Sequence, residues 1–242
     1  METRTKHLTV GSPQPSKADG LRLYSFELCP YAERVRLVLQ FKNLKYEAVN
    51  INLNKKPEWF LTINPAGKVP ALDTGNEIIT ESLVIVKYLE EKYPTPALYP
   101  AEPEDLKKTD ALISKIEIVT SVFYKCLMKP EDKTPEEWVK EFLTAIEPFE
   151  TELRGKRTTY FAGENPGIVD FMLWPWAEKA KALGMVLGQK LPFADNDIPN
   201  LIIWQKSMKS IPAVQAVYNS PEKFFKCLQL RKSTDDVDFD SI

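Results

Sequence analysis

The sequence predicts a small α/β domain with a mixed sheet, followed by an all-helical domain. Up to residue 93, short segments with the two-residue alternation of strands are interspersed with segments of helical periodicity. From residue 106 onward the periodicity is helical. Residues 94–105, between these regions, contain four prolines and cannot form a continuous helix or a central strand. We interpret them as a linker.

The elements of the first domain, residues 20–93, follow from their residue patterns. In chain order they are a strand at 21–26, a helix at 32–44, a strand at 46–52, a helix at 57–64, a hairpin of 69–72 with 76–80, and a helix at 81–93. This order is typical of an α/β unit with a mixed sheet. Residues 1–19 contain Pro, Ser and Gly, and we expect them to form a flexible leader.

The second domain, residues 106–242, is predicted to contain helices only. The segments with helical periodicity are 106–128, 135–153, 169–183 and 200–211, with shorter pieces to about residue 230. The sequence shows no internal repeat. It ends in the acidic stretch DDVDFD at 235–240, which we expect to be a solvated tail.

The composition excludes several classes of function. The 32 Lys and Arg residues nearly balance the 34 Asp and Glu residues, and both signs are interspersed, so we expect no nucleic-acid partner. The first residues lack the apolar core of a signal peptide, and the longest uncharged stretch, residues 210–221, is only 12 residues long. We therefore expect neither secretion nor membrane insertion. Three cysteines without a short-spaced pair favour a reducing cytoplasm.

Histidine chemistry is almost excluded by the residue counts. The only histidine is His7, so a Ser-His or Cys-His catalytic pair would have to recruit the leader. A zinc site built from Cys and His would have too few ligands, and we expect no metal.

Cys29 is the strongest candidate for chemistry. Pro30 suits the first position of a helix, which places Cys29 at the N-cap, where free backbone N–H groups and the helix dipole favour a thiolate. The alternative is a small buried hydrophobe, the usual state of a free cysteine. A resolving thiol would stand three positions on, but that residue is Ala32. A mixed disulfide at Cys29 therefore requires an external thiol, and glutathione is the obvious one.

Two further segments suit a peptide-like ligand such as glutathione. A cis Val69–Pro70 bond would turn the Val69 backbone groups outward to pair with an extended ligand, and the alternative is an ordinary trans proline at a strand start. Glu81 and Ser82 begin a helix, where a hydroxyl and N–H groups can hold a carboxylate and the Glu side chain can hold an ammonium. The alternative is that Thr80 or Ser82 is only an N-cap.

In this order, these segments resemble the cytosolic glutathione transferases of the omega class, and the insect members are the most similar. The resemblance covers about residues 20–230. It rests on LxLYSxxxCPYAERVRLVL, on NINLxxKPEWFLxxNPxGKVPAL, on the Glu81-Ser82 pair and on DFMLWPW. It implies a thioredoxin-like first domain, a helical second domain, a homodimer, and glutathione as co-substrate with no metal.

The resemblance also implies roles for individual residues. Cys29 is the nucleophile that forms a mixed disulfide with glutathione. The residues implied to hold glutathione are Tyr31, Lys56, Val69, Pro70, Glu81 and Ser82. The residues implied to line the acceptor pocket are Pro30, Trp176, Lys179, Phe224, Leu228 and Arg231. Read as plain structure, the aromatic residues of DFMLWPW are core instead.

Four positions depart from the usual family pattern. Tyr31 replaces Phe, Lys179 replaces an Arg, and Arg231 stands where an aromatic residue is often found. Gly167 stands where Ser or Thr usually caps a helix, and we expect Asp170 still to reach back to the N–H of the cap residue.

The implied activity is that of a glutathione-dependent thiol transferase and reductase. The implied acceptors are glutathionylated disulfides, dehydroascorbate or methylated arsenicals. One alternative is a chloride-channel-like protein of the same fold, against which the charges of Glu33, Arg34 and Arg36 in the first helix argue. Another is a non-catalytic carrier of hydrophobic ligands. We interpret Cys126 and Cys227 as structural thiols, with a redox role for Cys227 as the alternative.

Overall fold

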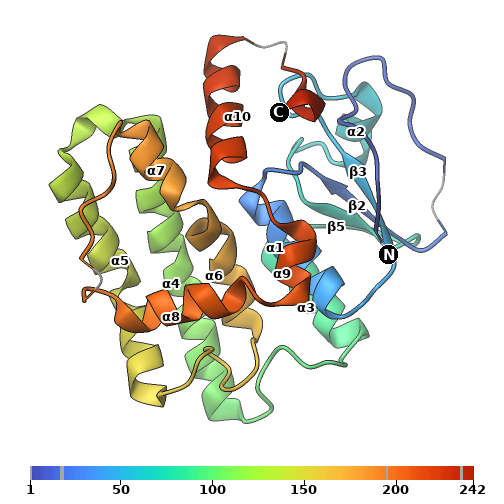
Figure 1. Cartoon of the computed structure of the whole chain (residues 1–242). Coiled ribbons are helices and arrows are strands. Elements are labelled where there is room, and N and C mark those ends of the chain that lie inside the picture. The colour runs from blue at the N-terminus through green and yellow to red at the C-terminus, as the bar shows by residue number, and fades with distance from the viewer. Residues whose placement is uncertain (1, 17–18, 195, 235–236) are drawn as a thin grey trace. The chain divides into compact units, whose positions relative to one another are not determined.

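The computed structural model in Figure 1 describes residues 2–16, 19–194, 196–234 and 237–242. Its internal contacts divide the chain into two units, Met1–Pro96 together with Lys226–Ile242, and Ala97–Phe225. The first change of unit falls inside the proline-rich segment 94–105, which we predicted to be a linker. The second was not predicted, because the sequence pattern placed everything after residue 105 in the helical domain.

The first unit contains a five-stranded mixed sheet. Its strands are β1 (Glu2–Arg4), β2 (Leu21–Ser25), β3 (Tyr46–Asn50), β4 (Ala71–Asp73) and β5 (Ile78–Thr80). The order across the sheet is β1-β3-β2-β4-β5. β2 is parallel to β3 and antiparallel to β4, and β4 is antiparallel to β5. The predicted mixed sheet and its hairpin are thus confirmed.

Three helices accompany this sheet: α1 (Pro30–Phe41), α2 (Glu58–Ile63) and α3 (Ser82–Lys92). α1 begins at Pro30 because proline needs no backbone N–H in the first helical turn. Its apolar side chains Val35, Leu37, Val38 and Leu39 are buried, and α1 contacts α3. The connection from β2 through α1 to β3 joins two parallel strands, so the residues just after β2 lie at the carboxyl edge of the sheet.

The leader belongs to the first unit, which corrects the prediction of a flexible segment at residues 1–19. β1 pairs with β3, and Leu8 forms a parallel bridge with Ile51. Without the leader, β3 would be an edge strand with unpaired backbone groups. The leader residues carry no local pattern that reveals this pairing. Residues 17 and 18 lie outside the described part of the chain.

The acidic tail also packs on the first unit, where we expected a solvated end. Phe239 is buried, and the centroid of its ring lies 4.9 Å from that of Phe26. The Nδ1 of His7 lies 2.8 Å from the Asp240 carboxylate, which also accepts a hydrogen bond from the His7 backbone N–H. The apolar residues alternating with the aspartates explain this packing. Residues 235 and 236 of the tail lie outside the described residues.

The second unit is helical, as predicted. Its helices are α4 (Pro103–Met128), α5 (Pro135–Lys156), α6 (Ile168–Lys179), α7 (Lys181–Val186), α8 (Pro199–Met208), α9 (Pro212–Val217) and the start of α10 (Pro221–Ser233). Short 3₁₀ helices occur at Pro130–Asp132 here and at Phe239–Ser241 in the first unit. Figure 1 shows α4 and α5 as antiparallel neighbours, and α6 and α8 pack on them. The single helix predicted at 169–183 is divided at Ala180 into α6 and α7. There the Ala180 N–H donates to the carbonyl oxygen of Ala177, three residues back, instead of four as in an α-helix.

The start of α6 explains the glycine at its cap. A Cβ added to Gly167 would lie 2.6 Å from the Cβ of Ala162 and 3.0 Å from the carbonyl oxygen of Leu98, so no side chain fits there. The Asp170 carboxylate accepts a hydrogen bond from the Gly167 N–H at 2.8 Å, which confirms the predicted contact. Glycine at this cap therefore follows from close packing, and Asp170 still supplies the half of the capping box that pairs with the N–H of the cap residue.

Asp170 is fully buried in the second unit and binds several donors. Its carboxylate also accepts hydrogen bonds from the Phe161 N–H at 3.1 Å and from Nε1 of Trp204 at 2.8 Å. Burial raises the pKa of Asp170 to about 6, although these donors favour the ionised form. One buried carboxylate thus joins the loop before α6 to α8.

Candidate active site

Cys29 occupies the N-cap of α1. Its backbone is extended, with φ −76° and ψ 119°, and Pro30 fills the first helical position, as predicted. The Cys29 carbonyl oxygen accepts the first helical hydrogen bond, from the Glu33 N–H at 2.9 Å. The side chain is half-buried, unlike those of Cys126 and Cys227, which are buried. A half-buried thiol at a helix start has the surroundings of a reactive cysteine.

The segment around Val69 lies directly beside Cys29. The Cys29 Sγ is 3.9 Å from the Val69 carbonyl oxygen. The Val69–Pro70 bond is cis, as one of the two interpretations predicted, and a second cis bond occurs at Thr95–Pro96. Two segments 40 residues apart in the sequence therefore meet at the thiol.

The start of α3 is joined to the start of α1 by Arg34. The Nη1 of Arg34 donates to the Ser82 hydroxyl at 3.5 Å, and its guanidinium carbon lies 5.5 Å from the centre of the Tyr31 ring. Ser82 is buried and Tyr31 is half-buried. Two residues predicted to hold glutathione thus share one arginine. Arg34 was not among the predicted site residues, because a charged side chain in a helix is usually expected to face solvent.

Glu81, the residue before Ser82, has an unusual backbone. It is the N-cap of α3, with φ 68°, and its side chain makes no cap hydrogen bond. Left-handed backbone is disfavoured for residues other than Gly, Asn and Asp, and such residues occur often at functional sites. The alternative in which Thr80 or Ser82 is the cap is therefore wrong, and Glu81 keeps an exposed carboxylate at a helix start.

Lys56 also approaches this region through its side-chain stem. A Cβ added to Gly67 would lie 3.3 Å from Cδ and 3.4 Å from Cε of Lys56. Gly67 lies two residues before Val69, so the stem of Lys56 lies close to the segment that contacts the thiol.

Arg36 holds the loop that precedes Cys29. Its Nη1 donates to the Ser25 hydroxyl at 3.1 Å and to the Phe26 carbonyl at 3.3 Å, and its Nη2 donates to the Glu27 carbonyl at 2.6 Å. The side chain is 2% exposed. Because these acceptors run from the end of β2 to the loop before Cys29, Arg36 holds that loop against α1. The role of Arg36 in holding this loop was not predicted either, because it depends on three acceptors that only the folded chain brings to its side chain.

The six residues predicted to line an acceptor pocket fall in both units. Pro30, Leu228 and Arg231 belong to the first unit, where the Nε of Arg231 donates to Asn54 at 3.1 Å. Trp176, Lys179 and Phe224 belong to the second. Lys179 is fully buried, with its ammonium 3.0 Å from Glu178 and 5.9 Å from the centre of the Phe224 ring.

Two negative findings concern only the residues that the structure describes. Among them, no helix is long and apolar enough to cross a membrane. Within the same residues, no three Cys, His, Asp or Glu side chains form a group that could hold a metal ion.

Comparison with known protein families gives matches to both units. Residues 23–97 match the N-terminal domain of glutathione S-transferases, and residues 133–202 match the C-terminal domain. Among solved structures, a rice glutathione transferase in complex with glutathione is 25% identical, with a TM-score of 0.75 over 90% of this chain and 100% of that one.

Two curated relatives are similar over nearly their whole length. The pyrimidodiazepine synthase of Drosophila melanogaster is 39% identical, over 93% of this chain and 93% of that protein. The omega-1 glutathione S-transferase of Rattus norvegicus is 32% identical, over 94% of this chain and 93% of that protein. With both domain models matched and relatives above 30% identity along the chain, the protein belongs to the glutathione transferase family of enzymes, in its omega class.

Proposed function

We propose that this enzyme is a glutathione-dependent thiol transferase and reductase that works through a mixed disulfide between Cys29 and glutathione. The observation that carries the proposal is the half-buried Cys29 thiol at the N-cap of α1, 3.9 Å from the Val69 carbonyl, with Ala32 where a resolving cysteine would stand. The other two cysteines are buried. The site thus supplies one accessible thiol, and a second thiol must come from glutathione.

In the proposed reaction, the Cys29 thiolate attacks the glutathione sulfur of a mixed disulfide. The acceptor leaves as a thiolate and takes a proton from solvent, while Cys29 becomes disulfide-bonded to glutathione. A second glutathione thiolate then attacks the glutathione sulfur of this intermediate. Glutathione disulfide leaves and the Cys29 thiolate is restored. Dehydroascorbate brings no glutathione with it, so its reduction consumes two free glutathione molecules, whose oxidation to glutathione disulfide supplies the two electrons and the two protons that the product takes up.

The residues around Cys29 suit the parts of glutathione. The Val69 backbone would pair with the cysteinyl residue, and Lys56 would face the glycyl carboxylate. Glu81 and Ser82 would hold the γ-glutamyl end, with Tyr31 beside the thiol. Pro70 shapes the Val69 segment. The role of Pro30, Trp176, Lys179, Phe224, Leu228 and Arg231 in holding the acceptor rests on the resemblance, as do dehydroascorbate and methylated arsenicals as acceptors.

Mass spectrometry of the intact protein tests the intermediate. After incubation with oxidised glutathione, we expect one glutathione per chain, mapped to Cys29 by peptide analysis, and its removal by reduced glutathione. The expected preference follows from the exposure of Cys29 relative to the buried thiols. An adduct on Cys126 or Cys227, or none at all, would contradict the mechanism.

Arg36 provides a second test, because it positions the thiol without touching it. We expect Arg36→Lys to lower kcat for a small glutathione mixed disulfide about tenfold with KM little changed, since an ammonium cannot reach all three acceptors and misplaced reacting groups lose rate steeply. Arg154→Lys, at an exposed position on α5, is the matched control. An unchanged kcat with a lowered melting temperature would restrict Arg36 to a role in stability.

We also propose a homodimer. Ile78, Leu83 and Val84 of the first unit expose 37%, 40% and 55% of their surface, and they belong to β5 and to α3, which contact each other. Neighbouring exposed apolar side chains of this kind mark interfaces between chains.

The free state of all three cysteines supports the proposed reducing, cytoplasmic location.

A further inference from the structure

We infer that His7 and Asp240 form a brace that positions the two loops presenting Cys29 and Lys56. The inference rests on the proposed function, in which these loops hold glutathione and its reaction partner. His7 is the only histidine of the chain. The carboxylate of Asp240, 233 positions away, lies 2.8 Å from Nδ1 of His7 and accepts the His7 N–H at 3.1 Å. One carboxylate therefore joins the leader to the end of the chain.

The brace packs against the thiol loop, residues 26–29 between β2 and α1. The side chain of His7 is 3% exposed, and the centroid of its ring lies 5.1 Å from that of Phe26. The ring of Phe239 lies 4.9 Å from that of Phe26 and 5.5 Å from that of His7. The Phe26 carbonyl oxygen accepts a hydrogen bond from the Cys29 N–H at 2.9 Å. Rings from the leader and from the tail thus hold the residue that binds the backbone of Cys29.

The leader continues from His7 to the lysine loop, residues 51–57 between β3 and α2. Three residues after His7, the Val10 N–H donates to the Lys55 carbonyl oxygen at 2.9 Å. Lys55 directly precedes Lys56, which would face the glycyl carboxylate of glutathione. Because β2 and β3 are parallel neighbours, the loops that follow them lie at the same edge of the sheet. The leader therefore contacts both loops of the proposed glutathione site.

The tail, residues 237–242, reaches the lysine loop through Asn52. This side chain is buried, and its Nδ2 donates to the Val237 carbonyl oxygen at 3.4 Å. Its Oδ1 accepts hydrogen bonds from the N–H groups of Asn54 and Lys55, at 3.0 and 3.1 Å. The residue that shapes the turn before the glutathione-binding lysine is thus also a contact of the tail.

The Asp240 carboxylate is the point at which these contacts depend on one another. The ends of a chain fray unless they are held, and hydrogen bonds to a carboxylate are among the stronger ones in proteins. Without the carboxylate, the tail loses both of its hydrogen bonds to His7, and the rings around Phe26 lose their fixed packing. Small displacements of reacting groups reduce the rate of a reaction steeply. Asp240 and His7 are therefore positioning residues for Cys29 and Lys56.

Alkylation of Cys29 by iodoacetamide, followed by mass spectrometry with peptide mapping, tests the brace in the absence of glutathione. Asp240→Ala should lower the alkylation rate about threefold or more, because a loosened loop takes the thiol away from the N–H groups at the start of α1. Ser241→Ala, at an exposed position of the same tail, is the matched control and should react at the rate of the wild type. Equal rates in the two variants would overturn the inference.

A double-mutant cycle tests whether His7 and Asp240 act together. His7→Ala should slow alkylation at least as much as Asp240→Ala, because it removes the ring against Phe26 as well as the hydrogen bonds. The double variant should react no more slowly than His7→Ala alone. Full additivity of the two effects would contradict the brace.

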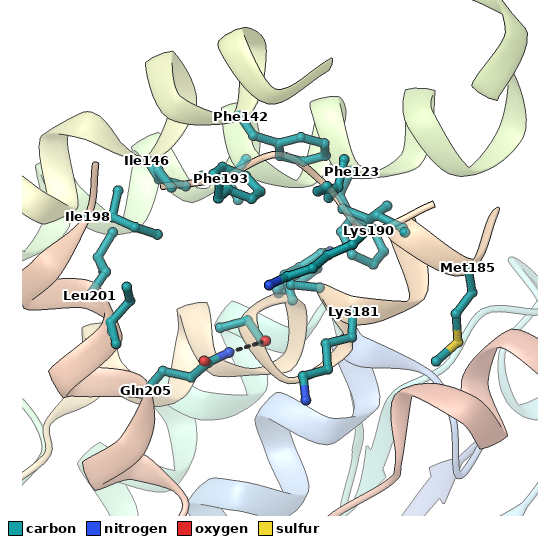
Figure 2. A pocket seen from close by; sticks show the side chains of 18 of the residues that line it. Phe123, Phe142, Ile146, Lys181, Met185, Lys190, Phe193, Ile198, Leu201 and Gln205 are labelled. Carbon is teal, nitrogen blue, oxygen red and sulfur yellow. Dashed lines mark hydrogen bonds between the residues drawn. The ribbon is translucent and has the colours of Figure 1, made fainter. Parts of the chain in front are cut away.

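A destabilising variant elsewhere separates positioning from stability. Phe142, a buried residue of α5, lines an apolar cavity in the helical unit, as Figure 2 shows. Phe142→Leu should lower the melting temperature by reducing buried contacts, yet leave the alkylation rate of Cys29 unchanged. If Phe142→Leu slows alkylation as much as Asp240→Ala does, the effect of Asp240 is one of general stability and the inference is wrong.

Turnover of a small glutathione mixed disulfide connects the brace to the proposed function. Asp240→Ala should lower kcat about fivefold through the thiol loop and raise KM for glutathione about threefold through the lysine loop. Unchanged kinetic constants would overturn the inference. Failure of the proposed function has a different signature, because activity would then persist in Cys29→Ser, while the comparison of alkylation rates would still measure the brace.

Discussion

Replacing Cys29 by serine should lower thiol transfer by roughly 10³-fold or more, because the reaction forms and breaks disulfide bonds at this sulfur and a hydroxyl cannot replace it. Both steps of the proposed mechanism pass through the Cys29 sulfur. The fold should survive, since Cys29 is half-buried and its backbone, rather than its side chain, begins α1. Turnover of a small glutathione mixed disulfide, with circular dichroism to check folding, measures the effect.

Cys126→Ser is the matched control for this substitution. Burial raises the pKa of the Cys126 thiol to about 11, so it is almost entirely protonated near neutral pH and is a poor nucleophile. Its side chain is fully buried in α4. The Cys126→Ser variant should keep the turnover of the wild type in its folded fraction. If Cys29→Ser retains most of the activity, or Cys126→Ser loses it, the mixed disulfide at Cys29 is refuted.

Replacing Asp170 by alanine should lower the free energy of unfolding by about 4 kcal/mol, since three buried donors lose their acceptor and each such loss costs about 1–3 kcal/mol. The donors are the backbone N–H groups of Gly167 and Phe161 and Nε1 of Trp204. Urea unfolding followed by tryptophan fluorescence measures the change. Asp110→Ala, on the exposed face of α4, should change it by less than about 0.5 kcal/mol. Equal effects of the two substitutions would show that the Asp170 network contributes no stability.

The effect of Asp170 should depend on pH. Burial raises its pKa from 3.8 in the unfolded chain to about 6. Between these values the folded protein binds more protons than the unfolded protein, so the stability contributed by this group is present below pH 4 and is lost as the pH rises through 6. The stability advantage of the wild type over Asp170→Asn should therefore shrink by about 3 kcal/mol at most between pH 4 and pH 7. A difference that grows with pH would contradict this assignment.

Parts of the fold could be predicted because they depend on neighbours in the chain. The start of α1 at Cys29-Pro30 follows from the backbone requirements of a single helical turn. The hairpin of β4 and β5 follows from a short polar turn between two strands, and α4 and α5 follow from their periodicity. The order of these elements then led to the correct mixed sheet. The placement of Cys29 at the start of α1 could be predicted for the same reason.

Other parts of the site and fold depend on contacts between distant segments. The charges of Arg34 and Arg36 counted in the sequence only against membrane insertion, yet both residues are buried, with acceptors in β2, in the β2–α1 loop and in α3. Gly167 weakens a cap pattern, but the close approach of Ala162 and Leu98 requires it. No local pattern in 1–19 or 235–240 indicates that His7 meets Asp240.

By itself, the sequence determined the fold class, the family, the position of Cys29 at the N-cap of a helix and the elements that follow from capping and periodicity, because these depend on chemistry within a few residues. Only the tertiary structure decided that both ends of the chain join the first unit and that buried arginines hold the loop before Cys29 and link α1 to α3. It also revealed a cavity beside Lys190 in the helical unit. These features arise where segments far apart in sequence satisfy the polar groups of one another or leave space between them, and a linear pattern of residues does not encode such pairings in recognisable form.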